Sequence, residues 1–452
     1  QPEILSYLEH VADRFDLRRD IQFESRVTGA SYDEARNRWE VRTDQGNCVS
    51  AQFLISAVGC LSAANIPKID GIESFEGDHY HTGAWPHEGV DFTGKRVGLI
   101  GTGSTGIQAT PVIAAEAEQL TVFQRTANFS VPARDVPLNP EDSREVKANY
   151  AEIRRLSRES SGGFPYAGVE RSALEVSDAE RKEIYERLWI DGGFKFMWAS
   201  FSDILATQEA NDTAADFIRD KIRATVKDPA VAEKLCPNDH PYGSKRPPID
   251  TDYFETFNRE NVTLVDVRES PIVEITPSGI RTESAEYELD TIVFATGFDA
   301  MTGALLRMNL RGLGGRTLDD KWTEGPKTYL GLQIAGFPNL FTITGPGSPS
   351  VLSNMPVSIE QHVEWVSDCI SHMREKGLAR IEATETAEEA WVDHVREAAD
   401  LTLFPLANSW YLGANIPGKK RVFMPYVAGV FTYRQYCDEV VRKGYEGFEL
   451  SP

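Results

Sequence analysis

Residues 95–108, KRVGLIGTGSTGIQ, constrain the fold of this chain more than any other stretch. They read as a short apolar strand, then a turn of the form G-x-G-x-x-G, then the start of a helix. Such a turn leaves backbone N–H groups free at the N-terminus of the helix, where they can bind phosphate. The stretch therefore predicts a βαβ unit that binds the pyrophosphate of a dinucleotide.

Each glycine of this turn has a separate expected role. The first permits the tight turn, the second lets the backbone approach the pyrophosphate, and the third allows the helix to pack closely on the strand. The alternative is a glycine-rich turn without a ligand, and the strand before it and the helix after it count against that. The expected nucleotide-binding turn comprises Gly101, Thr102, Gly103, Ser104, Thr105 and Gly106.

The residues after the second strand of the unit choose between nucleotides. About twenty residues beyond the turn, an NAD site carries an acid for the ribose hydroxyls and an NADP site carries an arginine for the 2′-phosphate. This chain has Arg125 and Thr126 there, and no acid. A guanidinium and a hydroxyl suit a phosphate dianion, so the sequence predicts NADPH. The alternative is that Arg125 is a solvated surface arginine.

Composition excludes several classes of function. The 452 residues predict two or three domains, and a net charge of −22 argues against a nucleic-acid partner. No window approaches the length of an apolar transmembrane helix, so we expect no membrane partner. The five cysteines never occur in C-x-x-C spacing, which predicts a reduced, cytoplasmic compartment and no metal site.

Periodicity along the rest of the chain predicts an α/β fold. Residues 2–17 and 357–377 have helical patterns, and residues 21–33 and 48–59 read as strands. Charged helical periodicity dominates residues 139–240, which we interpret as a helical insertion because strand patterns resume after it. A loop-rich tail is expected after the helix at 357–377.

A second motif stands just before the glycine-rich stretch. It has the form F-x-G-x-x-x-H-x-x-x-W-P and comprises Phe75, Gly77, His81, Trp85 and Pro86. With this motif the whole chain resembles the Baeyer–Villiger monooxygenases, flavoproteins that insert an oxygen next to a ketone carbonyl, and within them the steroid and phenylacetone monooxygenases. We expect His81 to act as a hinge or to couple domains, and not to act as a base, because a single histidine among aromatic residues is more often structural.

The resemblance implies a reaction and a catalytic residue. NADPH would reduce FAD, O₂ would give a flavin C4a-peroxide, and a small-molecule ketone would become an ester or a lactone. Lys245 and Arg246 match the Lys-Arg pair of the family, in which the arginine is catalytic. Pro247 favours an extended backbone before it, so the two side chains should point to opposite sides. Lys245 would then join Arg125 at the 2′-phosphate while Arg246 faces the flavin. The alternative is two surface cations before a proline turn.

Further residues match the family more weakly. Trp410 matches a tryptophan on a mobile loop that covers the nicotinamide nucleotide, and residues 348–352 resemble a bulge that shapes the ketone pocket. On the flavin side, Val27 corresponds to an adenine-contacting position after a strand, and Gly297 lies in an A-T-G strand end. Cys60 and Met355 match positions near the cofactor.

The resemblance also implies two dinucleotide-binding, Rossmann-like domains. Residues 1–55 and 292–452 would form the FAD domain, and residues 56–138 and 241–291 the NADP domain, with the helical insertion at 139–240. Family members carry an FAD fingerprint near their start, and this chain shows only the one at 101–106. We therefore expect the FAD domain to be incomplete here, with its first strand and glycine loop upstream of this sequence.

Two other functions are compatible with these motifs. One is a flavin-dependent N- or S-oxygenase, against which Trp85-Pro86 and the Lys-Arg pair count. The other is a non-catalytic NADP-binding protein that lacks FAD.

Overall fold

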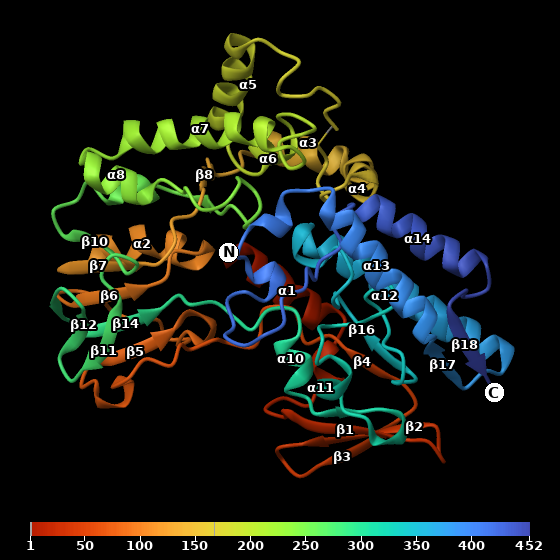
Figure 1. Cartoon of the computed structure of the whole chain (residues 1–452). Coiled ribbons are helices and arrows are strands. Elements are labelled where there is room, and N and C mark those ends of the chain that lie inside the picture. Colours follow the sequence, from red (N-terminus) through yellow and green to blue (C-terminus); the bar gives the residue numbers. More distant parts are fainter. Residues whose placement is uncertain (1, 167) are drawn as a thin grey trace.

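The predicted βαβ unit lies at the centre of a five-stranded parallel sheet in the computed structural model, which describes residues 2–166 and 168–452 (Figure 1). Apolar residues run continuously through the central strands, as expected for a sheet that is covered on both faces. The sheet order is β10 (Val262–Asp266), β7 (Gln119–Gln124), β6 (Arg96–Ile100), β14 (Thr291–Phe294) and β5 (Asp78–His81).

Both faces of this sheet are covered. Helix α2 (Ser104–Glu116) follows β6 directly and buries Ile107, Ile113 and Ala114 in a shared core. A small antiparallel sheet of β11 (Ile272–Thr276), β12 (Gly279–Thr282) and β13 (Glu286–Glu288) contributes to a second core, which contains residues of β7, β10 and β14. The predicted strand–turn–helix–strand order is therefore confirmed.

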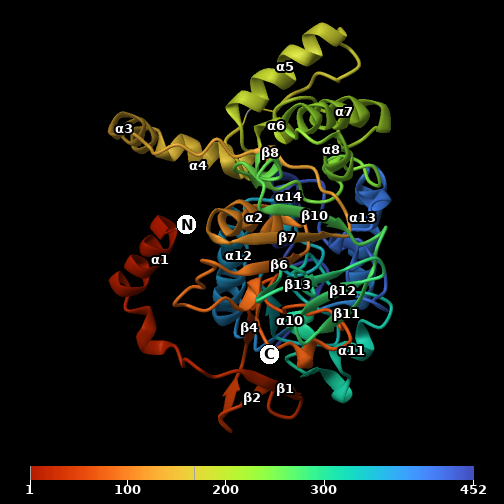
Figure 2. The ribbon, with the colours of Figure 1, turned by 90° about the vertical axis from the view of Figure 1, so that its left-hand side faces the viewer.

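The helical region predicted at 139–240 is also confirmed, and it lies above the sheet (Figure 2). In α7, Ala210, Ala214, Ile218 and Ile222 are buried at intervals of four residues, which is the spacing of one helix face. The helices of the region are α3 (Pro140–Ala148), α4 (Tyr150–Glu159), α5 (Asp178–Asp191), α6 (Lys195–Trp198), α7 (Gln208–Thr225) and α8 (Pro229–Leu235).

The other half of the molecule joins the start and the end of the chain. Strand β4 (Leu54–Ser56) pairs in parallel with β16 (Leu340–Thr342). Trp39 belongs to a separate hydrophobic core that contains apolar residues from 305–340. Its indole donates to Pro338 O at 2.8 Å. A four-stranded sheet completes this part, in the order β15 (Leu310–Arg311), β1 (Val27–Asp33), β2 (Arg38–Thr43) and β3 (Cys48–Ala51).

The expected loop-rich tail is wrong. Helix α12 (Met355–Lys376) appears as predicted, but α13 (Glu385–Asp400) and α14 (Val430–Arg442) follow it, and β17 (Arg380–Ala383) pairs with β18 (Phe448–Ser451). In α13 the buried residues Glu388, Trp391, Val395 and Ala399 recur at intervals of three and four residues, so the helical period is present in the sequence and the expectation overlooked it. This buried face packs against α12 and α14.

Three predicted boundaries also need correction. The strand expected at 21–33 is regular only over β1, and the one at 48–59 is two strands, β3 and β4, in different sheets. The domain boundary predicted at 292 would cut β14, which pairs with β5 and β6 and so belongs wholly to the nucleotide sheet.

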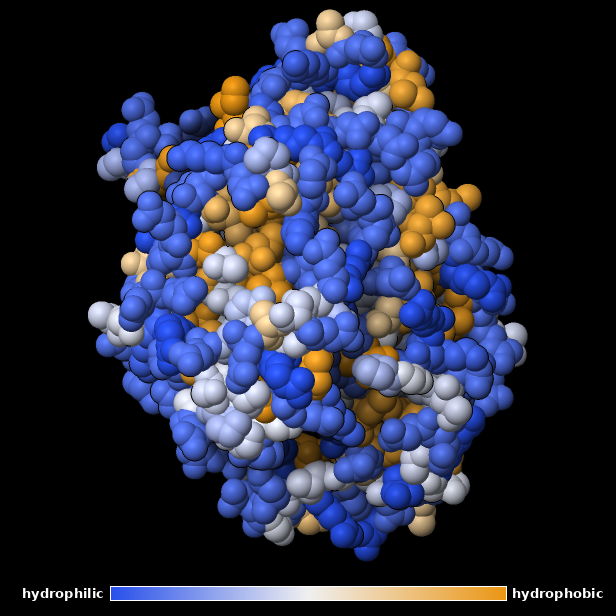
Figure 3. Space-filling model, turned by 60° about the vertical axis from the view of Figure 1, so that its left-hand side comes forward, coloured by the Kyte–Doolittle hydropathy of each residue, from blue (hydrophilic) through white to orange (hydrophobic). Residues whose placement is uncertain are grey.

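The remaining elements are short: β8 (Val131–Pro132), β9 (Ile249–Asp250), α9 (Tyr253–Thr256), α10 (Gly303–Leu306) and α11 (Leu318–Lys321). Helix α1 (Pro2–Arg14) buries none of its residues. One face of the molecule is mostly hydrophilic, with apolar residues gathered in a hollow near its middle (Figure 3). Among the described residues, every helix is too short or too polar to cross a membrane.

Candidate functional site

The glycine-rich turn has the geometry of a phosphate-binding loop. Gly101 has a φ of 111°, in the region that favours glycine. A Cβ on Gly106 would lie 2.0 Å from Gly101 O, whereas a Cβ on Gly103 would meet no atom within 4 Å. Backbone at Gly103 is therefore open to a ligand at the N-terminus of α2. Buried Thr102 ties the turn to the end of β7, since its Oγ1 donates to Thr126 O at 2.7 Å.

A cavity of about 350 Å³ opens beyond the end of β7, and Arg125, Asp239 and Arg268 help to line it. Lys245 lies close enough for its charge to interact with all three of them. Burial lowers the pKa of Lys245; Asp239 opposes this effect, and the two arginines add to it. Arg125, Lys245 and Arg268 therefore gather around Asp239 at one end of the cavity. The lining also includes Lys234 and the acids Glu233, Asp266 and Glu269, of which Glu233 pairs with Arg223 and Glu269 with Lys234. The three gathered cations suit a phosphate dianion.

Arg246 lies in different surroundings from its neighbour Lys245. Its Nη1 donates to Val351 O at 3.4 Å, and its guanidinium carbon lies 6.0 Å from the centre of the Phe194 ring. The positive charge of Arg246 also acts on the Cys60 thiol and on the Tyr411 hydroxyl. The segment before Pro247 forms a turn and a bend over residues 242–245 and not a regular extended strand, and it presents its two cations to two separate sites.

The surroundings of Arg246 are apolar. Cys60, Met301, Val351, Tyr411 and Met424 form one buried cluster, and burial raises the pKa of the Cys60 thiol against a hydrogen bond from Ser350. Two further residues singled out from the sequence, Met355 and Trp410, pack against this cluster. The structure therefore brings Cys60, Met355, Trp410, Arg246 and the 348–352 loop together.

The segment that follows Trp410 is fastened to the end of the nucleotide sheet. The amide of Asn415 donates to Phe298 O at 2.8 Å, and Lys419 Nζ donates to Ala300 O at 3.2 Å and pairs with Asp299. These contacts hold the Trp410 loop over the carboxyl end of β14, next to the apolar cluster.

The residues of the F-x-G-x-x-x-H-x-x-x-W-P motif are held by packing and by local hydrogen bonds. His81 is 6% exposed and its Nδ1 accepts from Gly83 N at 2.9 Å, while burial lowers the pKa of the ring. Its ring meets Phe298 edge-on at 5.9 Å, which places it beside the residues that anchor the Trp410 loop. The expected hinge role of His81 stays a prediction.

The other motif residues are explained by packing. A Cβ on Gly77 would lie 2.4 Å from Asp290 O and 2.7 Å from the Phe75 ring, so only glycine fits there. Trp85 packs between Tyr80 and Phe92, at 5.8 Å and 6.2 Å between ring centres, and Pro86 O closes the following turn by accepting from Gly89 N at 3.1 Å.

Two further predicted flavin positions are Val27 and Gly297, of which Val27 packs with a different core from the one around Arg246. Val27 is the first residue of β1 and packs near the Trp39 core, so the expectation that it follows a strand is wrong. Gly297 follows β14 with a φ of 76°, and a Cβ there would meet no atom within 4 Å. Gly297 therefore leaves open space for a ligand near the His81 ring.

Comparison with known proteins agrees with this arrangement. A family model described as pyridine nucleotide-disulphide oxidoreductase matches residues 1–178. A Baeyer–Villiger monooxygenase of Pseudooceanicola batsensis is 49% identical over 447 residues, which cover 98% of this chain and 81% of the relative. The chain belongs to the Baeyer–Villiger monooxygenase family.

Other proteins are similar to this chain over its whole length. A phenazine N-monooxygenase of Lysobacter antibioticus is 44% identical over 454 residues, which cover 100% of this chain and 83% of the relative. An oxidized steroid monooxygenase bound to NADP is 56% identical with a TM-score of 0.94, and OTEMO in complex with FAD and NADP is 44% identical with a TM-score of 0.96. Both matches cover the whole of this chain and 84% and 85% of those proteins, respectively.

The predictions of family, enzyme class and cofactors are confirmed at this level, since solved family members bind FAD and NADP. The open backbone at Gly103 and the cationic cavity fit NADP, and the open space at Gly297 fits a second cofactor.

Sequence reasoning missed several residues of this Baeyer–Villiger monooxygenase site. Met301, Tyr411 and Met424 were not predicted, because apolar residues in loops carry no periodic signal. Arg268 and Asp239 were also missed, although the position of Arg268 directly after a strand could have indicated it. It follows β10, which lies next to β7, and parallel neighbours end at the same edge of a sheet.

Proposed function

We propose that this chain uses NADPH, FAD and O₂ to convert an apolar ketone into an ester or a lactone, with Arg246 next to the reacting carbonyl. The observation that carries the proposal is the divergence of Lys245 and Arg246, one toward the cationic cavity and the other toward the buried cluster. One short segment thereby serves a nucleotide site and a reaction site.

NADPH would be held by the N-terminus of α2 and by the cations beyond β7. In this assignment residues 101–106 bind the pyrophosphate, while Arg125, Thr126 and Lys245 bind the 2′-phosphate. Trp410 would cover the nicotinamide end and limit the access of water, since its loop is anchored to residues 298–300.

FAD would lie between this sheet and the half of the molecule that contains β4 and β16, close to Cys60, Gly297 and Met355. We assign residues 56–138 and 241–297 to the NADP domain, and residues 1–55 and 298–452 to the FAD domain. Val27, which packs against the core around Trp39, would contact the adenine end of FAD. Bound FAD would supply the electrons that activate O₂.

Arg246 would stabilise negative charge that develops on the ketone oxygen. An arginine suits this role because its guanidinium stays protonated in proteins, so it cannot donate its proton to the oxidant. Its hydrogen bond to Val351 O fixes one edge of the guanidinium and leaves other N–H groups free to donate. The surrounding Met301, Val351 and Met424 side chains favour a ketone with an apolar body.

The experiment that tests this function is a competition between substrates. The purified protein, supplied with FAD, NADPH and O₂, is given an aryl ketone and an aryl sulfide together, and products are identified by mass spectrometry. We expect an ester that carries one oxygen from ¹⁸O₂. Consumption of NADPH with sulfoxide as the sole product would contradict the proposal.

One observation favours a second candidate, N-oxygenation. The phenazine N-monooxygenase is as similar to this chain as OTEMO is, at 44% identity. Adding an aromatic amine or phenazine to the same assay separates the two functions, since an N-oxide formed without ester would favour the second.

A further inference from the structure

Arg268 stands at the 2′-phosphate end of the nucleotide site for a topological reason. Strands β7 and β10 are parallel neighbours in register, with Gln124 opposite Asp266. Val267 N donates to Gln124 O at 2.9 Å, so the backbone segments that follow the two strands stay side by side beyond their last paired residues. Arg125 and Arg268 are therefore the first cations beyond two adjacent strand ends, and both line the same cavity.

The contacts of Arg268 hold its guanidinium in that cavity. Its Nη2 donates to Thr126 Oγ1 at 2.8 Å and pairs with Asp239. Thr126 is itself one of the residues assigned to the 2′-phosphate. The Arg268 side chain is 49% exposed, so these contacts orient it without burying it. Lys234 also lines the cavity, but it is paired with Glu269 at 2.6 Å.

Asp239 is fixed by the residues behind it. Its Oδ1 lies 2.6 Å from Nδ1 of His240, whose side chain is wholly buried. Burial alone would raise the pKa of Asp239, but hydrogen bonds from His240 and Arg268 lower it well below its usual range. The carboxylate is therefore charged at neutral pH.

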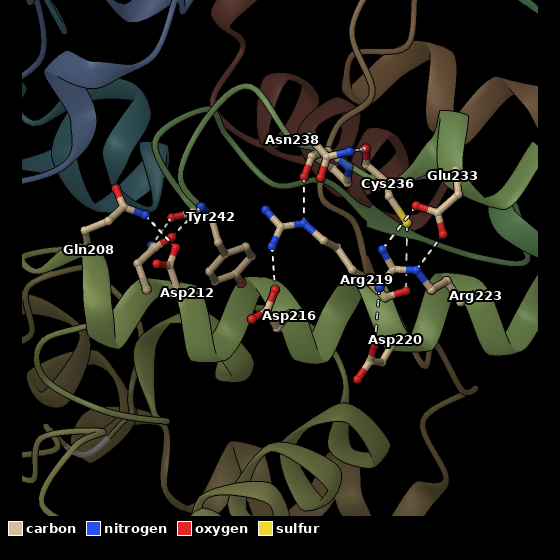
Figure 4. Close-up of polar contacts among 12 residues, drawn as sticks. Gln208, Asp212, Asp216, Arg219, Asp220, Arg223, Glu233, Cys236, Asn238 and Tyr242 are labelled. Atoms are coloured by element: carbon tan, nitrogen blue, oxygen red, sulfur yellow. Dashed lines mark hydrogen bonds and ion pairs between the residues drawn. The ribbon is translucent and has the colours of Figure 1, made fainter.

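The backbone that carries Asp239 and His240 is fastened to α7 (Figure 4). Arg219 Nε donates to Pro237 O at 2.8 Å, and Tyr242 N donates to Asn211 Oδ1 at 2.8 Å. The helical region thus fixes one side of the cavity, while the parallel sheet fixes the other.

From this geometry we infer that Arg268 is a specificity-determining residue, a third cation for the 2′-phosphate that increases the preference for NADPH over NADH, and that Asp239 is the positioning residue that orients it. The inference rests on the proposed NADPH site. Asp239 and Asp266 bring negative charge to this end of the cavity, and Arg268 offsets part of it by pairing with Asp239, so that Arg125 and Lys245 stay available to a phosphate dianion. NADH has no charge at this position and gains nothing from Arg268.

The test measures the binding of NADP⁺ and NAD⁺ by calorimetry to the purified protein and to Arg268→Ala, Arg268→Lys and Arg259→Ala. We expect Arg268→Ala to weaken NADP⁺ binding about tenfold and to change NAD⁺ binding less than about twofold. Arg268→Lys should recover part of the loss. Arg259 stands at the opposite end of β10 and contacts Asn261, so Arg259→Ala removes the same charge and should change neither affinity.

A fourth variant, Arg125→Ala, separates this inference from the proposed function. If Arg125→Ala weakens NADP⁺ selectively but Arg268→Ala weakens both nucleotides equally or neither, the role of Arg268 is overturned and the NADPH site stands. If Arg125→Ala shows no selectivity either, the proposed NADPH site itself is wrong.

Discussion

At the scale of single residues, buried histidines link stability to pH. His362 in α12 is fully buried, its Nδ1 accepts from Thr344 N at 2.9 Å, and its Nε2 lies 3.0 Å from the Tyr433 hydroxyl. Burial lowers its pKa from 6.5 to about 3. The folded protein therefore keeps this ring neutral at a pH where the unfolded chain protonates it.

We predict that the free energy of unfolding falls as the pH drops below about 6.5. Between pH 6.5 and 3 the unfolded state binds one more proton at His362, which costs up to about 1.4 kcal/mol per pH unit. Urea unfolding of the wild type and of His362→Gln at pH 7.5, 6.5 and 5.5 measures this slope. The variant should have the smaller slope below pH 6.5, and the exposed His87→Gln should keep that of the wild type. Equal slopes in all three proteins would disprove the assignment.

A residue could be predicted from the sequence where its role depends on residues close to it in the chain. Lys245 and Arg246 were placed on opposite sides because Pro247 restricts the backbone next to them. Arg125 was found by its distance from the glycine turn. Asp239 was not found, because its position depends on α7, which lies far from the sheet in sequence and touches this segment only in the folded protein.

At the scale of elements, the glycines at the β6–α2 junction have two kinds of role: some allow the backbone to pack closely, and another leaves space for a ligand. Gly101 has a φ of 111° and lies against Ala295 O, Gly106 allows α2 to approach the turn closely, and Gly103 is open on the ligand side. The three glycines of one motif therefore have different physical reasons for being glycine.

We predict opposite consequences for two alanine substitutions at this junction. Gly106→Ala should lower the free energy of unfolding by at least about 2 kcal/mol, because its Cβ would lie 2.0 Å from Gly101 O. Gly103→Ala should change it by less than about 1 kcal/mol, since Gly103 has an ordinary φ of −80°, but should weaken NADP⁺ binding. Denaturant unfolding and calorimetry measure the two effects. A stable Gly106→Ala protein, or a Gly103→Ala protein with unchanged affinity, would contradict this account.

Elements next to a recognisable motif or in a long charged helical stretch were predictable. Strands β6 and β7, helix α2 and the helical region over 139–240 appear as expected. Helix α13 has a regular buried stripe of Trp391, Val395 and Ala399 that packs against aromatic residues such as Tyr426, and the expectation of a loop-rich tail overlooked it. Strand β14 was divided by the predicted boundary because its partners, β5 and β6, lie about two hundred residues earlier.

At the scale of the whole molecule, two sites meet at one segment of chain. The parallel sheet ends beside the cationic cavity, and the C-terminal half supplies most of the apolar cluster around Arg246. Residues 298–300 and the Trp410 loop connect the two parts, with Asn415 and Lys419 as anchors. The proposed reaction requires both sites, because NADPH must deliver electrons close to the place where the ketone reacts.

The most direct test of this account compares Lys245→Ala with Arg246→Ala. For each protein, the dissociation constant of NADP⁺ and the rate of ester formation at saturating NADPH are measured. We predict that Lys245→Ala weakens NADP⁺ about tenfold and still forms ester at saturation, whereas Arg246→Ala binds NADP⁺ within about twofold of the wild type and loses at least about 99% of ester formation. Ester formation at the wild-type rate by Arg246→Ala, or equal losses of NADP⁺ affinity in the two variants, would contradict the division of these neighbouring cations between two sites.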